Sequence, residues 1–328
     1  MEQGSIPERY LESSILRNIK KHNREMIAGA GIGNDFSCIG EMVTSDGTAE
    51  SPVIAWNKAM NNFLCSAGEC IGARIYMMLP CGVKESQIKK YMGELNALAD
   101  ACKVQIMGGH TEVSSDVVNA RFIVTLYGKK KEYTHKKKNI EPGYDIVMTK
   151  YAGLLGTNIV IDRYYDVLAD RFAKSYLDGA RFDRMDYSVS EELLVINGVD
   201  NADICYLHDV STGGVYTALW QLGKWMDRGF IVEHSSIDIK QETIEVCEYL
   251  DINPYLMEGT GALLIVTSDG KKLVEELKNA GIPSGIIGKV TENKEKMIQI
   301  NDMEKRCLAP YTGDELYHII NKQNTLKN

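Results

Sequence analysis

The residues best suited to chemistry follow a pair of glycines in the first half of the chain. An imidazole, a hydroxyl and a carboxylate come directly after them, in the run Gly108-Gly109-His110-Thr111-Glu112. The apolar run 104–107 before them predicts a short buried strand, and the glycines predict a tight turn that approaches a ligand closely. A strand that ends in such a turn is one way in which α/β proteins bind phosphate. Taken alone, the pattern favours a plain turn.

A second run has the same design. Residues 202–207 predict a buried strand that ends in His208 and Asp209, and residues 215–226 predict the helix that follows. Gly213 and Gly214 stand at the start of that helix, where free N–H groups favour an anion. Since an imidazole titrates near neutrality, His110 and His208 are candidate proton-transfer groups. Each is equally well interpreted as a structural histidine that anchors its turn.

Two further carboxylates are candidates for a magnesium site. Asp35 follows the glycine-rich run 28–33, which is not a Walker A loop because no Gly-Lys-Ser/Thr follows. That run is equally well explained as a flexible link. Asp46 comes just past a predicted short strand, so it is the second candidate.

Several polar side chains interrupt otherwise apolar elements. The predicted core-facing helix 53–67 contains Asn57, Asn61 and Asn62, although Asn is a mediocre helix former. Exposure explains them simply, and hydrogen bonding to a ligand is the alternative. Lys150 follows a predicted strand and could neutralise a phosphate, although an ordinary surface lysine is the favoured interpretation.

Composition limits the class of protein. The chain has 328 residues, 44% hydrophobic and 25% charged, so it can bury a large core and form two domains. A net charge of -8 argues against nucleic-acid binding, and we interpret the basic run 129–138 as a solvated loop. No apolar run is long enough for a membrane span, and residues 1–10 contain no signal region, which predicts a cytoplasmic protein. Eight cysteines without a Cys-x-x-Cys pair predict reduced, mostly buried thiols.

Periodicity predicts alternating helices and strands, and therefore a mixed α/β (α+β) fold. We place a domain boundary at the turn near residues 140–143, which gives an N-terminal domain over 1–141 and a C-terminal domain over 142–328. The predicted helices cover 8–22, 53–67, 84–102, a stretch after 157, one through 176, 189–199, 215–226, 241–250 and 270–280. The predicted strands cover 36–40, 42–44, 73–79, 104–107, 121–127, 145–149, 202–207, 230–233, 262–267 and 286–290.

The ordered set of short motifs resembles the aminoimidazole ribonucleotide (AIR) synthetase superfamily. This superfamily includes thiamine-monophosphate kinase, selenophosphate synthetase and the hydrogenase-maturation carbamoyl dehydratase, and the likeness is strongest to the hydrogenase-maturation-factor-like branch. It spans roughly residues 28 to 292. The motifs that carry it are Gly33-Asn34-Asp35, Ser45-Asp46, Asn61-Asn62-Phe63, Gly108 to Glu112, Pro142 to Lys150, His208 to Gly214 and Glu258 to Leu263.

The resemblance implies a homodimer in which strands of the N-terminal domain join those of a second copy in a shared barrel. It also implies that magnesium and ATP bind between the domains, and that a small molecule is the substrate. By position, the implied metal ligands are Asp35, Asp46 and Asp209. The implied nucleotide-binding residues are Asn61, Asn62, Gly108, Gly109, Thr111, Gly213 and Gly214, and we add Lys150 as a further candidate.

Three departures bear on function. Asn62 stands where relatives carry Asp, Leu155 stands where close relatives often carry Glu, and the last cysteine is Cys307. The carbamoyl dehydratase carries its substrate group on a terminal cysteine, so we do not expect that chemistry in its usual form. The favoured hypothesis is an ATP-dependent enzyme that phosphorylates or activates a small substrate. The alternatives are a nucleotide-binding protein that has lost turnover and a maturation scaffold that works with a protein partner.

Overall fold

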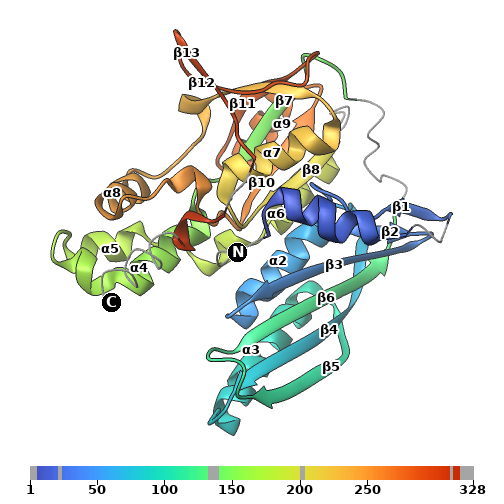
Figure 1. Cartoon of the computed structure of the whole chain (residues 1–328), viewed down its shortest axis with the longest axis vertical. Coiled ribbons are helices and arrows are strands. Elements are labelled where there is room, and N and C mark those ends of the chain that lie inside the picture. The colour runs from blue at the N-terminus through green and yellow to red at the C-terminus, as the bar shows by residue number, and fades with distance from the viewer. Residues whose placement is uncertain (1–5, 21–23, 132–139, 200–203, 311–312, 318–328) are drawn as a thin grey trace. The chain divides into compact units, whose positions relative to one another are not determined.

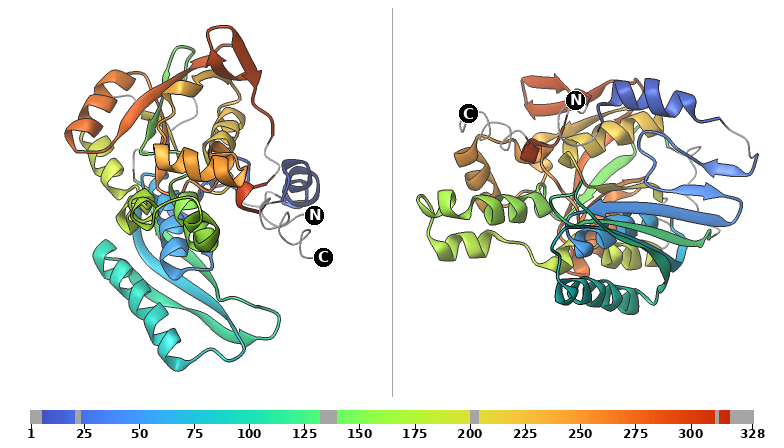
Figure 2. Two further views of the ribbon diagram at one scale, coloured as in Figure 1. Left: turned by 90° about the vertical axis from the view of Figure 1, so that its left-hand side faces the viewer. Right: turned by 60° about the horizontal axis from the view of Figure 1, so that its bottom comes forward.

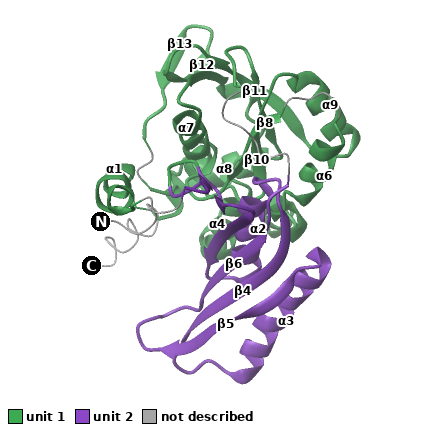
Figure 3. Cartoon of the chain, turned by 90° about the vertical axis from the view of Figure 1, so that its right-hand side faces the viewer, with its two compact units in different colours: residues 1–20, 31–33, 136–328 green, residues 21–30, 34–135 purple. Residues whose placement is uncertain are grey.

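The computed structural model describes residues 6–20, 24–131, 140–199, 204–310 and 313–317. It divides into two compact units, coloured separately in Figure 3. Unit 1 comprises the described residues within 1–20, 31–33 and 136–328, and unit 2 comprises those within 21–30 and 34–135. Each unit has its own β-sheet and its own apolar core. The short segment 31–33 of the glycine-rich run therefore belongs to a different unit from the residues on either side of it.

Unit 2 is built on a six-stranded sheet with the order β1-β2-β3-β6-β4-β5. The strands are β1 (Met26–Ala28), β2 (Ser37–Ile39), β3 (Met42–Ala49), β4 (Glu69–Pro80), β5 (Gln105–Ser114) and β6 (Arg121–Lys129). β4 and β5 pair parallel and are joined by a crossover through α3 (Glu85–Cys102), as parallel neighbours require (Figure 1). The other described pairings in this sheet are antiparallel.

One face of this sheet carries the core of unit 2. α2 (Pro52–Leu64) packs on β3 and β6, and it begins with a proline at its first turn, where a missing N–H is tolerated. α3 runs beside the strands (Figure 2) and contacts α2. The largest fully buried side chains here are Trp56, Phe63, Leu79, Leu95, Phe122 and Leu126. Because inward-facing residues alternate with outward-facing ones along each strand, the opposite face is more exposed, and it carries apolar residues such as Met42 and Ile123 as well as polar ones.

Unit 1 is built on a seven-stranded sheet with the order β13-β12-β9-β11-β7-β10-β8. Its strands are β7 (Asp145–Thr149), β8 (Ile204–Val210), β9 (Gly229–Glu233), β10 (Ala262–Thr267), β11 (Ser284–Thr291), β12 (Lys296–Asn301) and β13 (Glu304–Cys307). Its longer helices are α4 (Leu154–Ala169), α5 (Lys174–Ala180), α6 (Ser190–Gly198), α7 (Gly214–Met226), α8 (Gln241–Leu250) and α9 (Gly270–Asn279). All five residues of β7 and all six of β10 are buried, because α7 covers one face of the sheet and α6 and α9 cover the other (Figure 3).

Most predicted elements are confirmed, but three predictions about them are wrong. The buried strand expected to end at 107 is exposed along most of its length and continues through the two glycines as β5, and Asp46 lies inside β3 rather than after it. The single helix expected over 8–22 consists of short segments, α1 (Glu8–Tyr10), η1 (Leu11–Ile15) and η2 (Leu16–Asn18). None of their side chains is buried, so packing does not enforce one regular helix.

Some predictions fall on residues that the structure does not describe, and one hairpin was not predicted. Residues 132–138 of the basic run and residues 202–203 of the strand predicted over 202–207 lie outside the described residues. The hairpin of β12 and β13 was not predicted from its polar sequence. Within the described residues, we find no helix with the length and hydropathy of a membrane span.

Candidate functional site

Asp46 lies on the face of the unit 2 sheet opposite its core, and the residue is exposed. Its neighbours along β3, Ser45 and Gly47, are buried beneath α2. Thr125, which is opposite Asp46 in the β3–β6 register, donates its hydroxyl to Asp46 Oδ1 at 2.5 Å. Asn62 Nδ2 donates to the backbone carbonyl of Asp46 at 3.1 Å. Thr125 on β6 thus holds the exposed carboxylate, and Asn62 on α2 holds the backbone that carries it. An exposed carboxylate suits a cation that keeps most of its water.

The asparagines of α2 are used inside the protein. Asn61 is fully buried. Asn57 Nδ2 donates to Val53 O at 3.0 Å, one turn earlier in the helix. The Asn62 amide joins α2 to β3 through its N–H, which an ionised aspartate could not donate. Asn62 therefore has a structural use at a position where relatives of the superfamily carry Asp.

The Gly108-Gly109 pair does not form the predicted turn. β5 is the edge strand of the sheet, and both glycines lie within its parallel ladder with β4. A Cβ at position 109 would lie 1.6 Å from Ile75 O, so glycine is required by the close approach of the two strands. His110 Nε2 lies 3.4 Å from Glu112 Oε2, and these two side chains are 66% and 48% exposed. Thr111 is also exposed.

Sequence reasoning missed Arg74. The strand registers place Asp46 beside Thr125, Thr125 beside Arg74, and Arg74 beside Gly108. These four residues form one row across β3, β6, β4 and β5, so a carboxylate, a hydroxyl and a guanidinium share one face of the sheet. Nothing lies within 4 Å of a Cβ at Gly108, so the space beside Arg74 is open. The alternation of Arg74 with buried residues along β4 could have revealed it.

In unit 1, His208 and Asp209 lie within β8 and are 2% and 4% exposed. His208 Nε2 lies 3.0 Å from Gln221 Oε1 on α7, so its imidazole ties the strand to the helix. Tyr206, on the same side of β8, donates its hydroxyl to Gly33 O and stacks on Trp225 at 3.8 Å between ring centroids. The contacts of His208 match the structural interpretation, and Asp209 is on the opposite side of the strand.

The glycine loop 211–214 leads from β8 into α7. Gly213 N donates to Asp314 Oδ2 at 2.7 Å, and the Asp314 side chain is buried. Thr212 Oγ1 donates to Glu258 Oε2 at 3.0 Å, and Thr260 Oγ1 donates to Glu258 Oε1 at 2.7 Å. The start of α7 therefore holds an anionic group of the chain itself, as expected for free N–H groups at a helix N-terminus.

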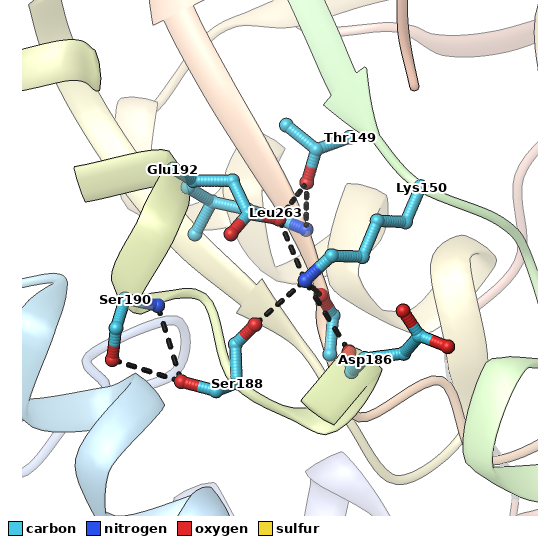
Figure 4. A network of polar contacts seen from close by, with 8 residues as sticks. Thr149, Lys150, Asp186, Ser188, Ser190, Glu192 and Leu263 are labelled. Atoms are coloured by element: carbon cyan, nitrogen blue, oxygen red, sulfur yellow. Dashed lines mark hydrogen bonds and ion pairs between the residues drawn. The ribbon is translucent and has the colours of Figure 1, made fainter. Parts of the chain in front are cut away.

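The Lys150 side chain is only 12% exposed. It lies within a network of polar contacts in unit 1 (Figure 4). Its ammonium contacts three backbone carbonyl oxygens and lies 2.8 Å from Glu192 Oε1. An ammonium has three N–H donors, so these contacts already occupy them. Lys150 in this arrangement has no donor left for a phosphate.

The remaining candidates concern the metal. Asp35 is half-buried in unit 2, and the neighbouring Asn34 Nδ2 donates to Gly29 O at 2.6 Å across the glycine-rich run. In the described part of the chain, no group of three or more His, Cys, Asp or Glu side chains is arranged to hold a metal ion. Magnesium is usually bound by one or two carboxylates together with water and substrate phosphates, and the exposed Asp46 fits that mode.

Comparison with known proteins supports the resemblance inferred from the motifs. No protein-family model matches the sequence. The chain is 21% identical over 271 residues to a protein of Methanocaldococcus jannaschii named "Putative hydrogenase expression/formation protein", covering 80% of this chain and 77% of that one. It is 24% identical over 198 residues to the phosphoribosylformylglycinamidine synthase subunit PurL of Saccharolobus solfataricus. That match covers 56% of this chain and only 27% of the length of PurL.

Solved structures share the fold. The HypE–HypF complex matches with a TM-score of 0.74 and 18% identity over 85% of this chain and 94% of that one. The hydrogenase maturation protein HypE in complex with ATP matches with a TM-score of 0.69 and 15% identity over 94% and 93%. The predicted resemblance to the AIR synthetase superfamily is confirmed, and the two sheets form the mixed α/β fold of these structures.

Proposed function

We propose that this chain is a magnesium- and ATP-dependent enzyme that phosphorylates a small substrate or activates it by phosphoryl transfer. The row that joins Asp46, Thr125 and Arg74 carries the proposal, because a carboxylate for a cation and a guanidinium for a phosphate share one sheet face. A solved structure of the same fold, HypE, is in complex with ATP. Bound magnesium would neutralise charge that develops on the transferred phosphoryl group.

Most of the proposed roles follow the positions that the resemblance implies. Proposed ligands of magnesium are Asp35, Asp46 and Asp209. Proposed nucleotide-binding residues are Asn61, Asn62, Gly108, Gly109, Thr111, Gly213 and Gly214, to which we add Arg74. His110 is the preferred candidate for proton transfer because its side chain is exposed, whereas His208 is buried against Gln221. An exposed imidazole can reach a substrate without rearrangement of the core.

We further propose that the protein is a homodimer in which β5 pairs with a second copy, and that the sequence boundary between its N-terminal and C-terminal domains lies near residue 141. β5 is an edge strand, and its Met107 and Val113 are 52% and 55% exposed. Unpaired strand edges with apolar side chains favour pairing with another chain. Light scattering of the purified protein tests this, with Val113→Lys as the variant that should yield monomer and a monomeric wild type as the contradicting result.

A maturation or assembly role with a protein partner is the second candidate. HypE has been solved as a complex with HypF, and the sequence matches a protein named for hydrogenase expression and formation. Asn62 also favours it, because the carboxylate that relatives carry at this position is replaced by an amide already bonded to Asp46 O. In this case ATP would be bound with little or no turnover.

Two measurements on the purified chain separate the candidates. Calorimetry measures the binding of magnesium-ATP, and an assay of ATP hydrolysis is run with and without a screen of small metabolites. Asp46→Asn and Asp209→Asn should each weaken binding by about tenfold or more, because each removes a proposed charge beside the metal. Asp100→Asn, on the exposed face of α3, is the matched control and should bind as the wild type does. Binding without hydrolysis would favour the partner-dependent role. A wild type that binds no magnesium-ATP would overturn both candidates.

A further inference from the structure

The Lys150 ammonium is the centre of a buried polar network (Figure 4). It donates to the carbonyl oxygens of Asp186, Ser188 and Gly261 at 3.3, 2.6 and 3.1 Å. The Lys150 side chain is 12% exposed, and its ionic partner Glu192 is 0% exposed. Charges so far from solvent persist only where hydrogen bonds and an opposite charge satisfy them. The network is therefore a fixed part of the structure.

The same network also holds Leu263, two residues after Gly261. Glu192 Oε1 also accepts a hydrogen bond from Thr149 Oγ1 at 3.2 Å. Thr149 Oγ1 in turn accepts from Leu263 N at 3.2 Å. Adjacent residues at the end of β7 thus hold Gly261 and Leu263, the residues on either side of the first residue of β10.

The segment held in this way is packed against its neighbours on both sides. A Cβ at Gly261 would lie 2.1 Å from Asp186 O, so the loop before α6 lies directly on the turn. Gly259 N, on the other side of the turn, donates to Ser211 O at 3.1 Å. Glu258 in the same turn accepts the hydroxyl of Thr212. An unbroken series of contacts therefore leads from the Lys150 ammonium to the glycine loop 211–214.

We propose that Lys150 is a positioning residue for the glycine loop 211–214. Its ammonium, neutralised by Glu192, fixes the carbonyl of Gly261 and so keeps the turn 257–261 against the loop. Glu258 then holds Thr212, and the Gly213 amide keeps its direction at the start of α7. The assignment rests on the proposed function in that the loop is the phosphate-binding one. In this proposal Lys150 positions the loop and does not itself contact the phosphate.

The test compares Lys150→Met with Lys289→Met in the full chain. Lys289 is a matched control because its ammonium lies 2.5 Å from Asp145 Oδ1 at the opposite end of β7, and its side chain is 63% exposed. Hydrogen exchange with mass spectrometry, without ligand, follows the amides of 211–214 and 257–262. We expect about tenfold or faster exchange there in Lys150→Met, because several hydrogen bonds to a charged group are lost. The control should leave these amides unchanged, and Lys150→Arg should restore much of the protection.

A second readout separates positioning from general destabilisation. Affinities for inorganic phosphate and magnesium-ATP are measured at a temperature where both variants are folded. Weaker anion binding in Lys150→Met than in Lys289→Met, together with local exchange, supports the inference. Unchanged exchange at both segments in a folded Lys150→Met overturns it, whatever the binding result. If wild type binds neither anion, the proposed function fails while the exchange result still decides the positioning role. Should Lys150→Met not fold, Glu192→Gln is judged by the same measurement.

Discussion

Gly47 offers the sharpest test of how unit 2 positions Asp46. A Cβ added at this position would lie 2.2 Å from Ala55 O and 2.3 Å from Ala59 N, which are backbone atoms of α2. Ordinary contact begins near 3.4 Å, so Gly47→Ala must push the helix away from β3 by about 1 Å. Overpacking of this kind costs about 1–3 kcal/mol. The bond from Ser45 Oγ to Ala59 O, 2.7 Å long, crosses the same contact and contributes about 1 kcal/mol more.

We therefore expect Gly47→Ala to lower the free energy of unfolding of unit 2 by about 3 kcal/mol. Pulsed hydrogen exchange across a urea series, read by mass spectrometry on peptides of β3 and β6, reports this unit separately. Gly93→Ala is the control, because nothing lies within 4 Å of its Cβ and it lies inside α3. That change should stabilise by about 0.5–1 kcal/mol through helix propensity. A loss below about 1 kcal/mol in Gly47→Ala would refute the packing argument.

Two further predictions use the ionisable groups. Burial and the charge of Arg306 lower the pKa of His234 from its ordinary 6.5, and Tyr216 lies 2.8 Å from its Nδ1. The unfolded chain then binds the proton at higher pH than the folded one, so stability should fall as the pH drops below 6.5. The urea midpoint of unfolding should change less with pH in His234→Gln than in the wild type. An equal change with pH in both proteins would contradict this prediction. Burial also raises the pKa of Cys70 to about 11, so at about pH 8 iodoacetamide should modify it at least about tenfold more slowly than the exposed Cys81. Equal rates by peptide mapping would contradict that prediction.

The sequence could predict those elements whose apolar residues repeat with one period. The strand 145–149 was located to the residue, and the helices that became α2, α3 and α7 were located to within three residues at each end. The helices bury one face and the strand buries all of its residues, so the apolar pattern in the sequence matches the pattern of burial in the structure. The hairpin of β12 and β13 was not predicted, because few of its residues are buried and its alternation of apolar and polar residues is weak.

The Gly108-Gly109 run shows why a local pattern can mislead. Two glycines after an apolar run are compatible with a turn and with a strand that another strand approaches closely. The choice depends on Ile75, whose carbonyl lies where a Cβ at 109 would be. Ile75 is more than thirty residues away in the sequence, so no local rule could decide between them. The polar residues after the glycines are exposed, and they lie along a strand rather than after a turn.

Lys150 shows the same limit for a charged residue. A lysine after a strand is usually exposed, and the favoured sequence interpretation followed that rule. Its burial depends on three carbonyls and a carboxylate that come from a loop, a turn and α6, and no sequence pattern marks their convergence. The position also has φ 54°, which costs a non-glycine residue energy and persists where the surroundings fix it.

The two glycine motifs of the chain therefore use the absence of a side chain for different ends. At 109 it allows two strands to approach, and the exposed groups of β5 then share a sheet face with Asp46 and Arg74. At 213 the backbone N–H is directed at an anion, and the carboxylate of Asp314 accepts it. An amide that already binds a carboxylate has the direction that a phosphate oxygen requires. The loop in unit 1 is thus a candidate for a phosphate contact in which the phosphate would replace the Asp314 carboxylate, and the sheet face in unit 2 is the candidate for the cation and for a phosphate at Arg74.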